Sequence, residues 1–252
     1  MHNSITVEGY QLTEAIFESP KSIVFRGIQE HGKLAIVVKI LNKQYPDPME
    51  LAKFRQEYEI AKSLDIEGVI KTYGMQLHEN SPIIVMEDFF GESIQKIQQH
   101  NELTIKEILS IGIRIAGTLH EIHKQNIIHK DICPANIIWN KKQDILKIID
   151  FGISTQLSNE IAEVINPNLL EGTISYVSPE QTGRINRSID YRSDFYSLGV
   201  TFYELLTNKL PFEGNDSMEI VHSHIAKTPI PPSTIKKSIP TVISNIVMKL
   251  LE

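Results

Sequence analysis

Residues 126–152, NIIHKDICPANIIWNKKQDILKIIDFG, determine how the rest of the chain must be arranged. They contain two short acidic loops, one around Asp131 and one beginning at Asp150. Two apolar runs, 136–139 and 145–149, lie between the loops and are joined by a polar turn. Such runs are predicted to pair as an antiparallel hairpin. The hairpin would bring both acidic loops to the same end, where they can act together.

The residue types in these loops suit phosphoryl transfer. In that chemistry one carboxylate orients the attacking hydroxyl, while an aspartate and an asparagine hold magnesium against nucleotide phosphates. The ordered motifs HKDxxxxN and DFG, separated by a hairpin, resemble the catalytic and magnesium loops of the protein kinase family. The resemblance implies that Asp131 is the catalytic base and that Asn136 and Asp150 are metal ligands. It also implies ATP and Mg²⁺ as cofactors.

Composition and charge limit the possible classes of protein. The chain has 252 residues, of which 41% are hydrophobic and 22% charged, enough for one large domain or two lobes. A net charge of −6 gives no reason to expect nucleic-acid binding. A single cysteine excludes a disulfide framework and fits a reducing compartment. With no apolar run of 18 residues and no secretory signal, we expect no membrane span and a cytoplasmic location.

The N-terminal part is predicted to be a sheet that departs from the family pattern at its first turn. Three strands are predicted: 10–16, 22–27 and 34–41. In the protein kinase family the first turn is a glycine-rich loop over the phosphates. Aligned on Val24, its three glycine positions carry Phe17, Ser19 and Ser22. Pro20 removes a further backbone donor. A plain hairpin is therefore an alternative interpretation of these residues.

A lysine and a glutamate are predicted to form an ion pair beside the acidic loops. The third strand ends in IVVK at Lys39, which is similar to the VAIK strand of the family. A helix is predicted to begin at Pro48, because Asp47 supplies an N-cap and Glu50 completes a capping box. Glu57 lies beside the apolar stripe of that helix, in the FRQEYEIAKSL context where the family has its helical glutamate. The resemblance implies that Lys39 and Glu57 are catalytic-site residues that pair with each other.

The nucleotide base is expected to lie against the fifth strand and the hinge after it. Residues 83–89, IIVMEDF, resemble that part of the family. The resemblance implies Met86 as the gatekeeper and places the backbone of Glu87 and Phe89 against the adenine edge. Apolar walls for the base are implied at Ile16, Val24, Val37 and Ile138. Val37 stands where the family usually has alanine, which makes that wall bulkier.

From about residue 90 the pattern becomes helical. Thr104 and Glu107 form a capping box, and apolar residues at helical spacing follow as far as about residue 124. His120, His123 and His129 lack the closing spacing of a zinc site. His129 is predicted to be a packed residue that supports the catalytic loop. Asp194, at the start of a buried helix, is expected by resemblance to bond the backbone of that loop from beneath.

Other positions bear on activity and on specificity. Lys130 replaces the arginine that grips a phosphorylated activation loop, so such control is not expected. Cys133 replaces a lysine of serine/threonine kinases, which could slow turnover by on the order of a hundredfold. Thr173, in the closing motif 172–180, is expected to brace Asp131. Glu180 has no arginine partner further along the chain, so the domain is expected to be incomplete at its C-terminus.

Residues 179–212, PEQTGRINRSIDYRSDFYSLGVTFYELLTNKLPF, carry a finer resemblance. They are similar to the N-terminal serine/threonine kinase domain of large bacterial signalling proteins, in which an ATPase module and a sensor histidine kinase follow. Further domains in the same parent chain are therefore implied. The expected fold is α+β and bilobal. It has a five-stranded antiparallel sheet with one helix in an N-lobe, 1–88, and a mainly helical C-lobe, 89–252.

The expected function is Mg-ATP-dependent phosphorylation of serine or threonine hydroxyls in a protein substrate. The alternative is a pseudokinase, a nucleotide-binding module that regulates neighbouring domains. The loop without glycine, Pro20 and Cys133 favour that alternative. A small-molecule phosphotransferase fits less well, because the segment 173–180 and the helix of Asp194 resemble protein kinases.

Overall fold

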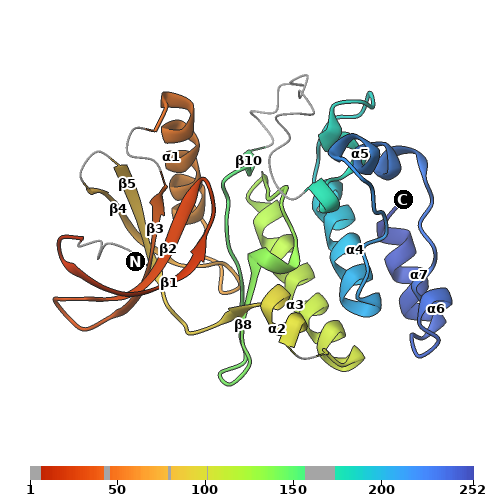
Figure 1. Cartoon of the computed structure of the whole chain (residues 1–252), viewed down its shortest axis with the longest axis horizontal. Coiled ribbons are helices and arrows are strands. Elements are labelled where there is room, and N and C mark those ends of the chain that lie inside the picture. The colour runs from red at the N-terminus through yellow and green to blue at the C-terminus, as the bar shows by residue number, and fades with distance from the viewer. Residues whose placement is uncertain (1–6, 43–45, 79–80, 101, 157–173) are drawn as a thin grey trace.

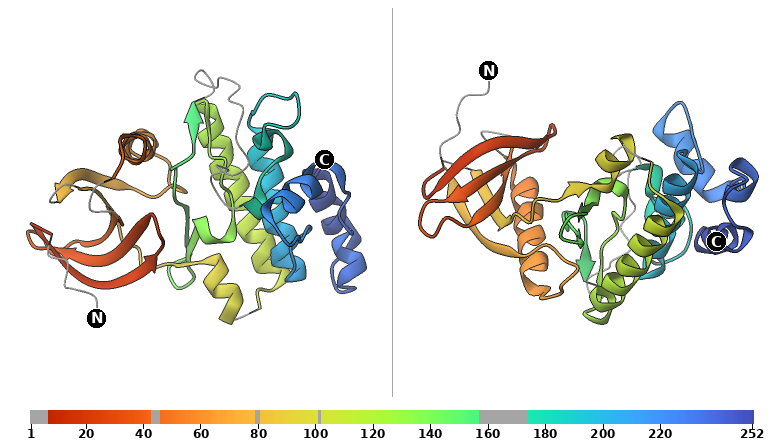
Figure 2. Two further views of the ribbon diagram at one scale, coloured as in Figure 1. Left: turned by 45° about the horizontal axis from the view of Figure 1, so that its top comes forward. Right: turned by 90° about the horizontal axis from the view of Figure 1, so that it is seen from below.

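The computed structural model describes residues 7–42, 46–78, 81–100, 102–156 and 174–252. A sheet with helix α1 forms one lobe, and a mainly helical lobe lies beside it (Figure 1). Two further views show the same separation between the N-terminal strands and the C-terminal helices (Figure 2). The predicted bilobal α+β fold is therefore confirmed. The predicted division of the chain at residues 88 and 89 stays a prediction.

Within the described residues, the sheet of the N-lobe has five antiparallel strands in the order β1-β2-β3-β5-β4. The strands are β1 (Tyr10–Glu18), β2 (Ser22–Gln29), β3 (Ala35–Leu41), β4 (Thr72–His78) and β5 (Ser81–Glu87). Side chains alternate between the two faces of a strand. In β3, Ile36 and Val38 are fully buried on one face. Lys39 therefore points from the other face, together with Val37.

Helix α1 (Pro48–Ser63) covers the face of the sheet from which Lys39 points. The capping box predicted at its start is present: Asp47 accepts from the N–H of Glu50 at 2.9 Å, and Glu50 accepts from the N–H of Asp47 at 3.1 Å. Phe54 and Tyr58 are buried against Ile84 of β5 in one hydrophobic cluster. This packing fixes the height and the rotation of α1 over the sheet, and so the direction of its inward-facing side chains.

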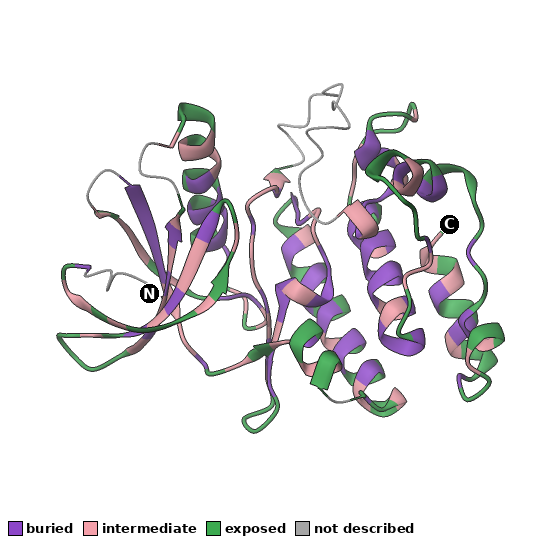
Figure 3. Cartoon of the chain, viewed as in Figure 1, coloured by how far each residue is buried: buried purple, intermediate pink, exposed green. Residues whose placement is uncertain are grey.

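The C-lobe is built around two long helices. Helix α3 (Ile105–Lys124) begins at the predicted Thr104–Glu107 capping box and buries Ile108, Ile115 and Leu119. Helix α4 (Arg192–Thr207) is buried along most of its length, as the purple ribbon in the centre of this lobe shows (Figure 3). The other α-helices of the lobe in the part of the chain that the structure describes are α2 (Ile94–His100), α5 (Ser217–Ala226), α6 (Pro232–Ile235) and α7 (Thr241–Leu250). None of the helices in the described ranges is long and apolar enough to cross a membrane.

The hairpin predicted from the sequence lies between the N-lobe and α3 (Figure 1). Strands β8 (Ile137–Asn140) and β9 (Ile145–Ile148) pair antiparallel, with Ile137 opposite Ile148. In the turn, the side chain of Asn140 accepts backbone hydrogen bonds from Lys142 and Gln143, both at 3.1 Å. Short pieces complete this region: β6 (Glu92–Ser93), β7 (Ile127–Ile128), β10 (Thr155–Gln156), and the 3-10 turns η1 (Pro134–Asn136), η4 (Ile174–Tyr176) and η5 (Pro179–Thr182). Both acidic loops therefore leave the hairpin at the same end, as predicted.

The segment before β4 contacts strand β9 of this hairpin at Gly68, a position where only glycine fits. Gly68 accepts a hydrogen bond from the N–H of Ile148 at 2.8 Å. A Cβ added to Gly68 would lie 1.9 Å from Oγ1 of Thr118 in α3. The absence of a side chain thus lets the segment before β4 approach both α3 and β9.

Candidate active site

Three charged side chains meet where β3, α1 and the segment after β9 come together. Nζ of Lys39 lies 2.6 Å from Oε1 of Glu57 and 3.3 Å from Oδ1 of Asp150. The side chains of Lys39 and Glu57 are only 13% and 10% exposed, whereas that of Asp150 is 40% exposed. The structure therefore brings together three of the residues that the sequence nominated. Asp150 is the member that faces outward.

The electrostatics of this cluster follow from its burial and from its unequal charges. Burial raises the pKa of Glu57 from its ordinary value of 4.5 to about 7, although the charge of Lys39 opposes the rise. Burial also disfavours the ammonium of Lys39, but the carboxylates of Asp150 and Glu57 outweigh it and raise the pKa of Lys39. Burial also disfavours the charged form of Asp150 and so tends to raise its pKa. The charge of Lys39 and the N–H of Gly152 outweigh this effect and hold the pKa of Asp150 below the ordinary value. Lys39 is therefore a permanent cation, and Asp150 a permanent anion, at neutral pH.

The backbone at Asp150 is unusual. Its φ is 66°, in the left-handed region that non-glycine residues rarely occupy. Oδ1 of Asp150 accepts from the N–H of Gly152 at 3.2 Å, which stabilises this turn. The following Phe151 is buried and packs edge-on against His129, with ring centroids 4.8 Å apart. The conformation of the second acidic loop is thus tied to the first.

His129 supports the first acidic loop, as predicted. It is fully buried, and its Nδ1 accepts from the N–H of Asp131 at 3.2 Å. Its Nε2 then carries the proton and donates to the carbonyl of Ile149 at 3.1 Å. The carboxylate of the fully buried Asp194 accepts from the N–H groups of His129 and Lys130 at 2.9 and 2.7 Å. The predicted position of Asp194 beneath the loop is therefore confirmed.

Asp131 and Asn136 lie side by side. Nδ2 of Asn136 donates to both the carbonyl oxygen and Oδ2 of Asp131, each at 2.9 Å. The carbonyl of Asn136 accepts from the N–H of Ile149 at 3.0 Å, directly before Asp150. The predicted polar residues therefore form two hydrogen-bonded groups. Asp131 and Asn136 form one, and Lys39 with Glu57 and Asp150 forms the other.

The hinge is held by side chains from both lobes. Glu87 forms an ion pair with Lys147 of β9, and both side chains are largely buried. Asp88 pairs with Arg26 of β2 at 3.0 Å. The carbonyl oxygen of Phe89 accepts from Nδ2 of Asn140 at 2.6 Å. These contacts fix the backbone that was predicted to face the adenine edge.

The predicted apolar walls are all half-buried. They are Ile16 on β1, Val24 on β2, Val37 on β3 and Ile138 on β8. Val24 is paired with Lys39 in the sheet, and Val37 is paired with Met86. Lys96 of α2 donates to the carbonyl oxygen of Ile16 at 3.0 Å, so β1 reaches the C-lobe at this point.

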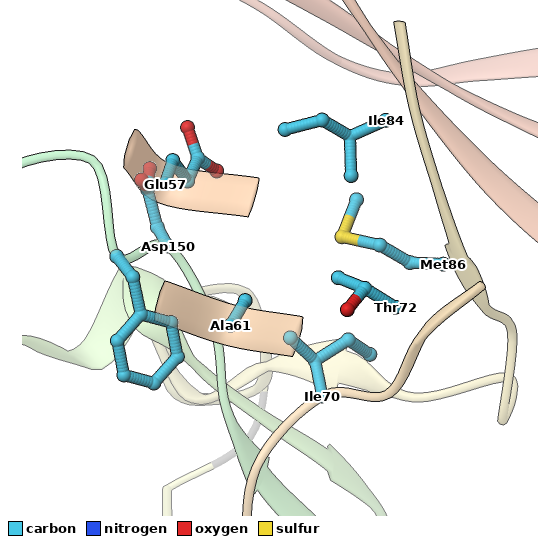
Figure 4. A pocket seen from close by; sticks show the side chains of 8 residues that line it. Glu57, Ala61, Ile70, Thr72, Ile84, Met86 and Asp150 are labelled. Atoms are coloured by element: carbon cyan, nitrogen blue, oxygen red, sulfur yellow. The ribbon is translucent and has the colours of Figure 1, made fainter. Parts of the chain in front are cut away.

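A small cavity of about 10 Å³ lies behind Met86 (Figure 4). The side chains of Glu57 and Asp150 lie on one side of it, and those of Ile84 and Met86 on the other. Its volume corresponds to about one water molecule. Thr72 also lines it, and the Oγ1 of Thr72 is buried without a hydrogen-bond partner among the described residues.

Two departures from the expected pattern have structural consequences. Cys133 is 1% exposed and is buried among Tyr176, Tyr196 and Val200, so its side chain packs in the C-lobe core. Glu180, for which the sequence offered no arginine, accepts a hydrogen bond from Ser193 at 2.5 Å. The predicted brace Thr173 lies outside the described residues.

The structure also shows contacts on the first acidic loop that sequence reasoning missed. Ser154, Gln181 and Thr201 each donate a side-chain hydrogen bond to a carbonyl of that loop. All three are at least 95% buried. Thr201, a polar residue within an otherwise apolar helical stretch, gave a sequence signal, whereas Ser154 and Gln181 stand among other polar residues and gave none.

With this geometry the class of the protein is defined. A family model described as the protein kinase domain matches residues 10–252, and the chain belongs to the protein kinase family. It is 30% identical over 245 residues to a probable serine/threonine-protein kinase of Clostridium perfringens, covering 96% of this chain and 35% of the relative. It is 33% identical over 218 residues to the serine/threonine-protein kinase PrkC of Bacillus subtilis, covering 85% and 33%. PknB of Mycobacterium tuberculosis is 32% identical over 223 residues, covering 86% and 35%. The chain spans about a third of the length of these curated relatives.

Proposed function

We propose that this chain transfers the γ-phosphoryl group of ATP to serine or threonine hydroxyls of a protein substrate. The observation that carries the proposal is the contact of Lys39 with both Glu57 and Asp150. In protein kinases a lysine–glutamate ion pair and the metal-binding aspartate must both be in place for catalysis. Family membership and the relatives, which are named as serine/threonine kinases, support the same reaction.

Each polar residue has a separate role in this proposal. Asp131 receives the proton of the attacking hydroxyl, and Asn136 holds its carboxylate in place through Nδ2. Lys39 supplies a fixed positive charge to the nucleotide phosphates, and Glu57 directs that charge. The Asp131 carboxylate therefore acts as a positioned base, while Lys39 stabilises negative charge that increases at the phosphates.

The residues present fit magnesium bound with ATP. Nδ2 of Asn136 is used for Asp131, which leaves its amide oxygen for a cation. Asp150 uses Oδ1 for Lys39 and Gly152, which leaves its second oxygen. Two oxygen ligands together with phosphate oxygens are the usual protein environment of Mg²⁺. When bound, the ion neutralises charge on the phosphate oxygens. The half-buried residues Ile16, Val24, Val37 and Ile138, together with Met86 and the backbone at Glu87 and Phe89, are proposed to hold the adenine.

A transfer assay tests the proposal directly. The purified chain is incubated with Mg²⁺ and radiolabelled ATP, with and without casein as a generic substrate, beside Asp131→Asn. We expect label on the chain or on casein with the wild type, and a reduction of at least about a hundredfold in the variant. Equal labelling by both proteins, or no labelling by either, would contradict the proposed reaction.

The comparisons give no support to the pseudokinase alternative, and thermal unfolding with and without ATP, measured beside the transfer assay, distinguishes it. A pseudokinase would be stabilised against thermal unfolding by ATP and would transfer no label. The burial of Cys133 and the loop that carries Pro20 predict slow turnover rather than none, because the base and the proposed metal ligands are present.

We further infer that the chain is the kinase domain of a longer cytoplasmic signalling protein. Its similarity in residues 179–212 to the N-terminal kinase domain of multidomain bacterial proteins supports this. The single cysteine and the requirement for ATP support the compartment. The sequence of the complete gene is the test, and an ATPase module and a sensor histidine kinase encoded downstream are the expected result.

A further inference from the structure

The carbonyl groups of the first acidic loop are held one by one from different parts of the fold. The carbonyl of His129 accepts from Ser154 at 2.9 Å, and that of Lys130 accepts from Gln181, also at 2.9 Å. The carbonyl of Asp131 accepts from Asn136 at 2.9 Å. Each bond restricts rotation of one peptide plane. These hydrogen bonds are not equivalent, because only the planes that contain the carbonyls of Lys130 and Asp131 adjoin Asp131.

The peptide plane directly before Asp131 is held at both of its ends. Its N–H belongs to Asp131 and donates to Nδ1 of His129. Its carbonyl belongs to Lys130 and accepts from Nε2 of Gln181. Rotation of this plane changes the direction in which the Asp131 side chain leaves the backbone. Gln181 and His129 thus hold the peptide plane from which the Asp131 side chain leaves the backbone, while Asn136 contacts the carboxylate itself.

The backbone of Lys130 makes this restraint necessary. Its φ is 70°, in the left-handed region that is costly for a residue with a Cβ. Such a conformation persists only where surrounding contacts hold it. Asp194 holds the N–H of Lys130, and Gln181 holds its carbonyl.

The orientation of the Gln181 amide is fixed by its partners. Its Oε1 accepts from the N–H and the hydroxyl of Ser178, at 3.2 and 2.9 Å. A backbone N–H can only donate, and a carbonyl can only accept, so Nε2 must face Lys130. The side chain is 5% exposed and has no room to turn outward. One buried amide therefore joins the end of the activation segment, at η5, to the catalytic loop.

We propose that Gln181 is a positioning residue for Asp131, through which the closing turn of the activation segment sets the direction of the base. This inference rests on the proposed function of Asp131. Gln181 provides a neutral connection between the two segments, because it binds the backbone carbonyl of Lys130 and not its side chain. The connection is formed when η5 is folded and does not require a phosphate.

Gln181→Glu tests the proposal with almost no change in shape. The ionised carboxylate keeps the acceptor for Ser178 but cannot donate to Lys130, whereas burial favours the protonated form, which can. Gln181→Met, in which no proton can restore the donor, is therefore measured beside it and decides the outcome. Ser178→Ala is the matched control, since it removes a bond to the same amide and leaves the bond to Lys130. For Gln181→Glu we expect kcat to fall at least tenfold while the KM for ATP stays within twofold. For Ser178→Ala we expect both constants to stay within twofold.

Backbone hydrogen exchange gives a measurement that does not depend on activity. In Gln181→Glu the N–H of Asp131 is expected to exchange at least tenfold faster than in the wild type, and in Ser178→Ala at an unchanged rate. Gln181→Met removes the donor without burying a charge, and it is compared in the same way.

Unchanged kcat in folded Gln181→Met, or an equal fall in Ser178→Ala, overturns the proposal. If the wild type itself transfers no phosphate, the proposed function fails, and the exchange rates alone decide the role of Gln181. An unchanged exchange rate at Asp131 then overturns it.

Discussion

Lys39 and Glu57 form a buried ion pair, with Nζ and Oε1 2.6 Å apart, that joins strand β3 to helix α1. The pair is present together with the contact between Lys39 and Asp150, which connects the N-lobe to the segment after β9. Helix α1 therefore packs against the sheet, and the Lys39 ammonium lies between the carboxylates of Glu57 and Asp150. This is the arrangement that protein kinases require for transfer.

Replacing Glu57 by glutamine should slow phosphoryl transfer by about ten- to a hundredfold, because a neutral partner no longer directs the Lys39 ammonium as strongly. Steady-state kcat with Mg-ATP is the measurement. Glu59→Gln is the matched control, since Glu59 lies two residues further along α1 and is exposed. A loss of the same size in the control, or no loss in Glu57→Gln, would show that the ion pair does not serve catalysis.

The same glutamate should make stability depend on pH. The folded state raises the pKa of Glu57 from 4.5 to about 7, so it binds more protons than the unfolded state between these values. The contribution of Glu57 to the free energy of unfolding is then fully present below pH 4.5 and is lost as the pH rises through 7. Its size is on the order of 2–4 kcal/mol.

Denaturant unfolding at several pH values between 4.5 and 8 measures this contribution in the wild type and in Glu57→Gln. We expect the difference in unfolding free energy between the two proteins to change across this range, and to be constant outside it. The lowered pKa of Asp150 acts below about pH 4, outside this range. A difference that is the same at pH 5 and pH 8 would mean that Glu57 keeps its ordinary pKa.

Sequence patterns were sufficient to predict the residues that lie in short motifs. The hairpin and both capping boxes are each specified by neighbours within a few positions, so their residue types are constrained locally. Lys39 and Glu57 each lie in a short motif, but their pairing across 18 positions was implied by the family resemblance. The contacts of Gln181 and Ser193 join segments whose residues do not constrain each other in sequence. Glutamine and serine are also common on surfaces, so burial alone reveals their role, and burial requires the folded chain.

Asp194 should contribute strongly to the stability of the C-lobe. It is fully buried, and its two oxygens accept from the N–H groups of His129 and Lys130 and contact His123 at 2.7 Å. Asp194→Asn would turn an NH₂ group toward one of these donors. We expect a loss of about 3 kcal/mol or more in unfolding free energy, because a buried donor is left without an acceptor. Chemical denaturation measures it.

The control for this change is Asp190→Asn, which weakens the ion pair of Asp190 with the more exposed Arg192. Surface ion pairs contribute about 0–1 kcal/mol, so the control should be nearly as stable as the wild type. Equal stability of Asp194→Asn and the wild type would show that water replaces these contacts without cost.

Gly68 and Thr118 provide a test of how the two lobes are joined. A Cβ at Gly68 would lie 1.9 Å from Oγ1 and 2.9 Å from Cβ of Thr118, so Gly68→Ala must push β4 and its preceding segment away from α3. We expect Gly68→Ala to lower the unfolding free energy by about 1–3 kcal/mol, the usual cost of overpacking. Thr118→Ala removes the hydroxyl and one methyl and should restore part of this loss when the two changes are combined.

A double-mutant cycle on Gly68→Ala and Thr118→Ala measures the coupling, with unfolding free energies from denaturant titrations of all four proteins. The clash predicts a coupling of about 1 kcal/mol or more in the stabilising sense. Gly74→Ala is the control, because a Cβ at Gly74 meets no atom within 4 Å. If the effects of the two substitutions were simply additive, the close approach of Gly68 to α3 would not be the contact that joins the N-lobe to the hairpin.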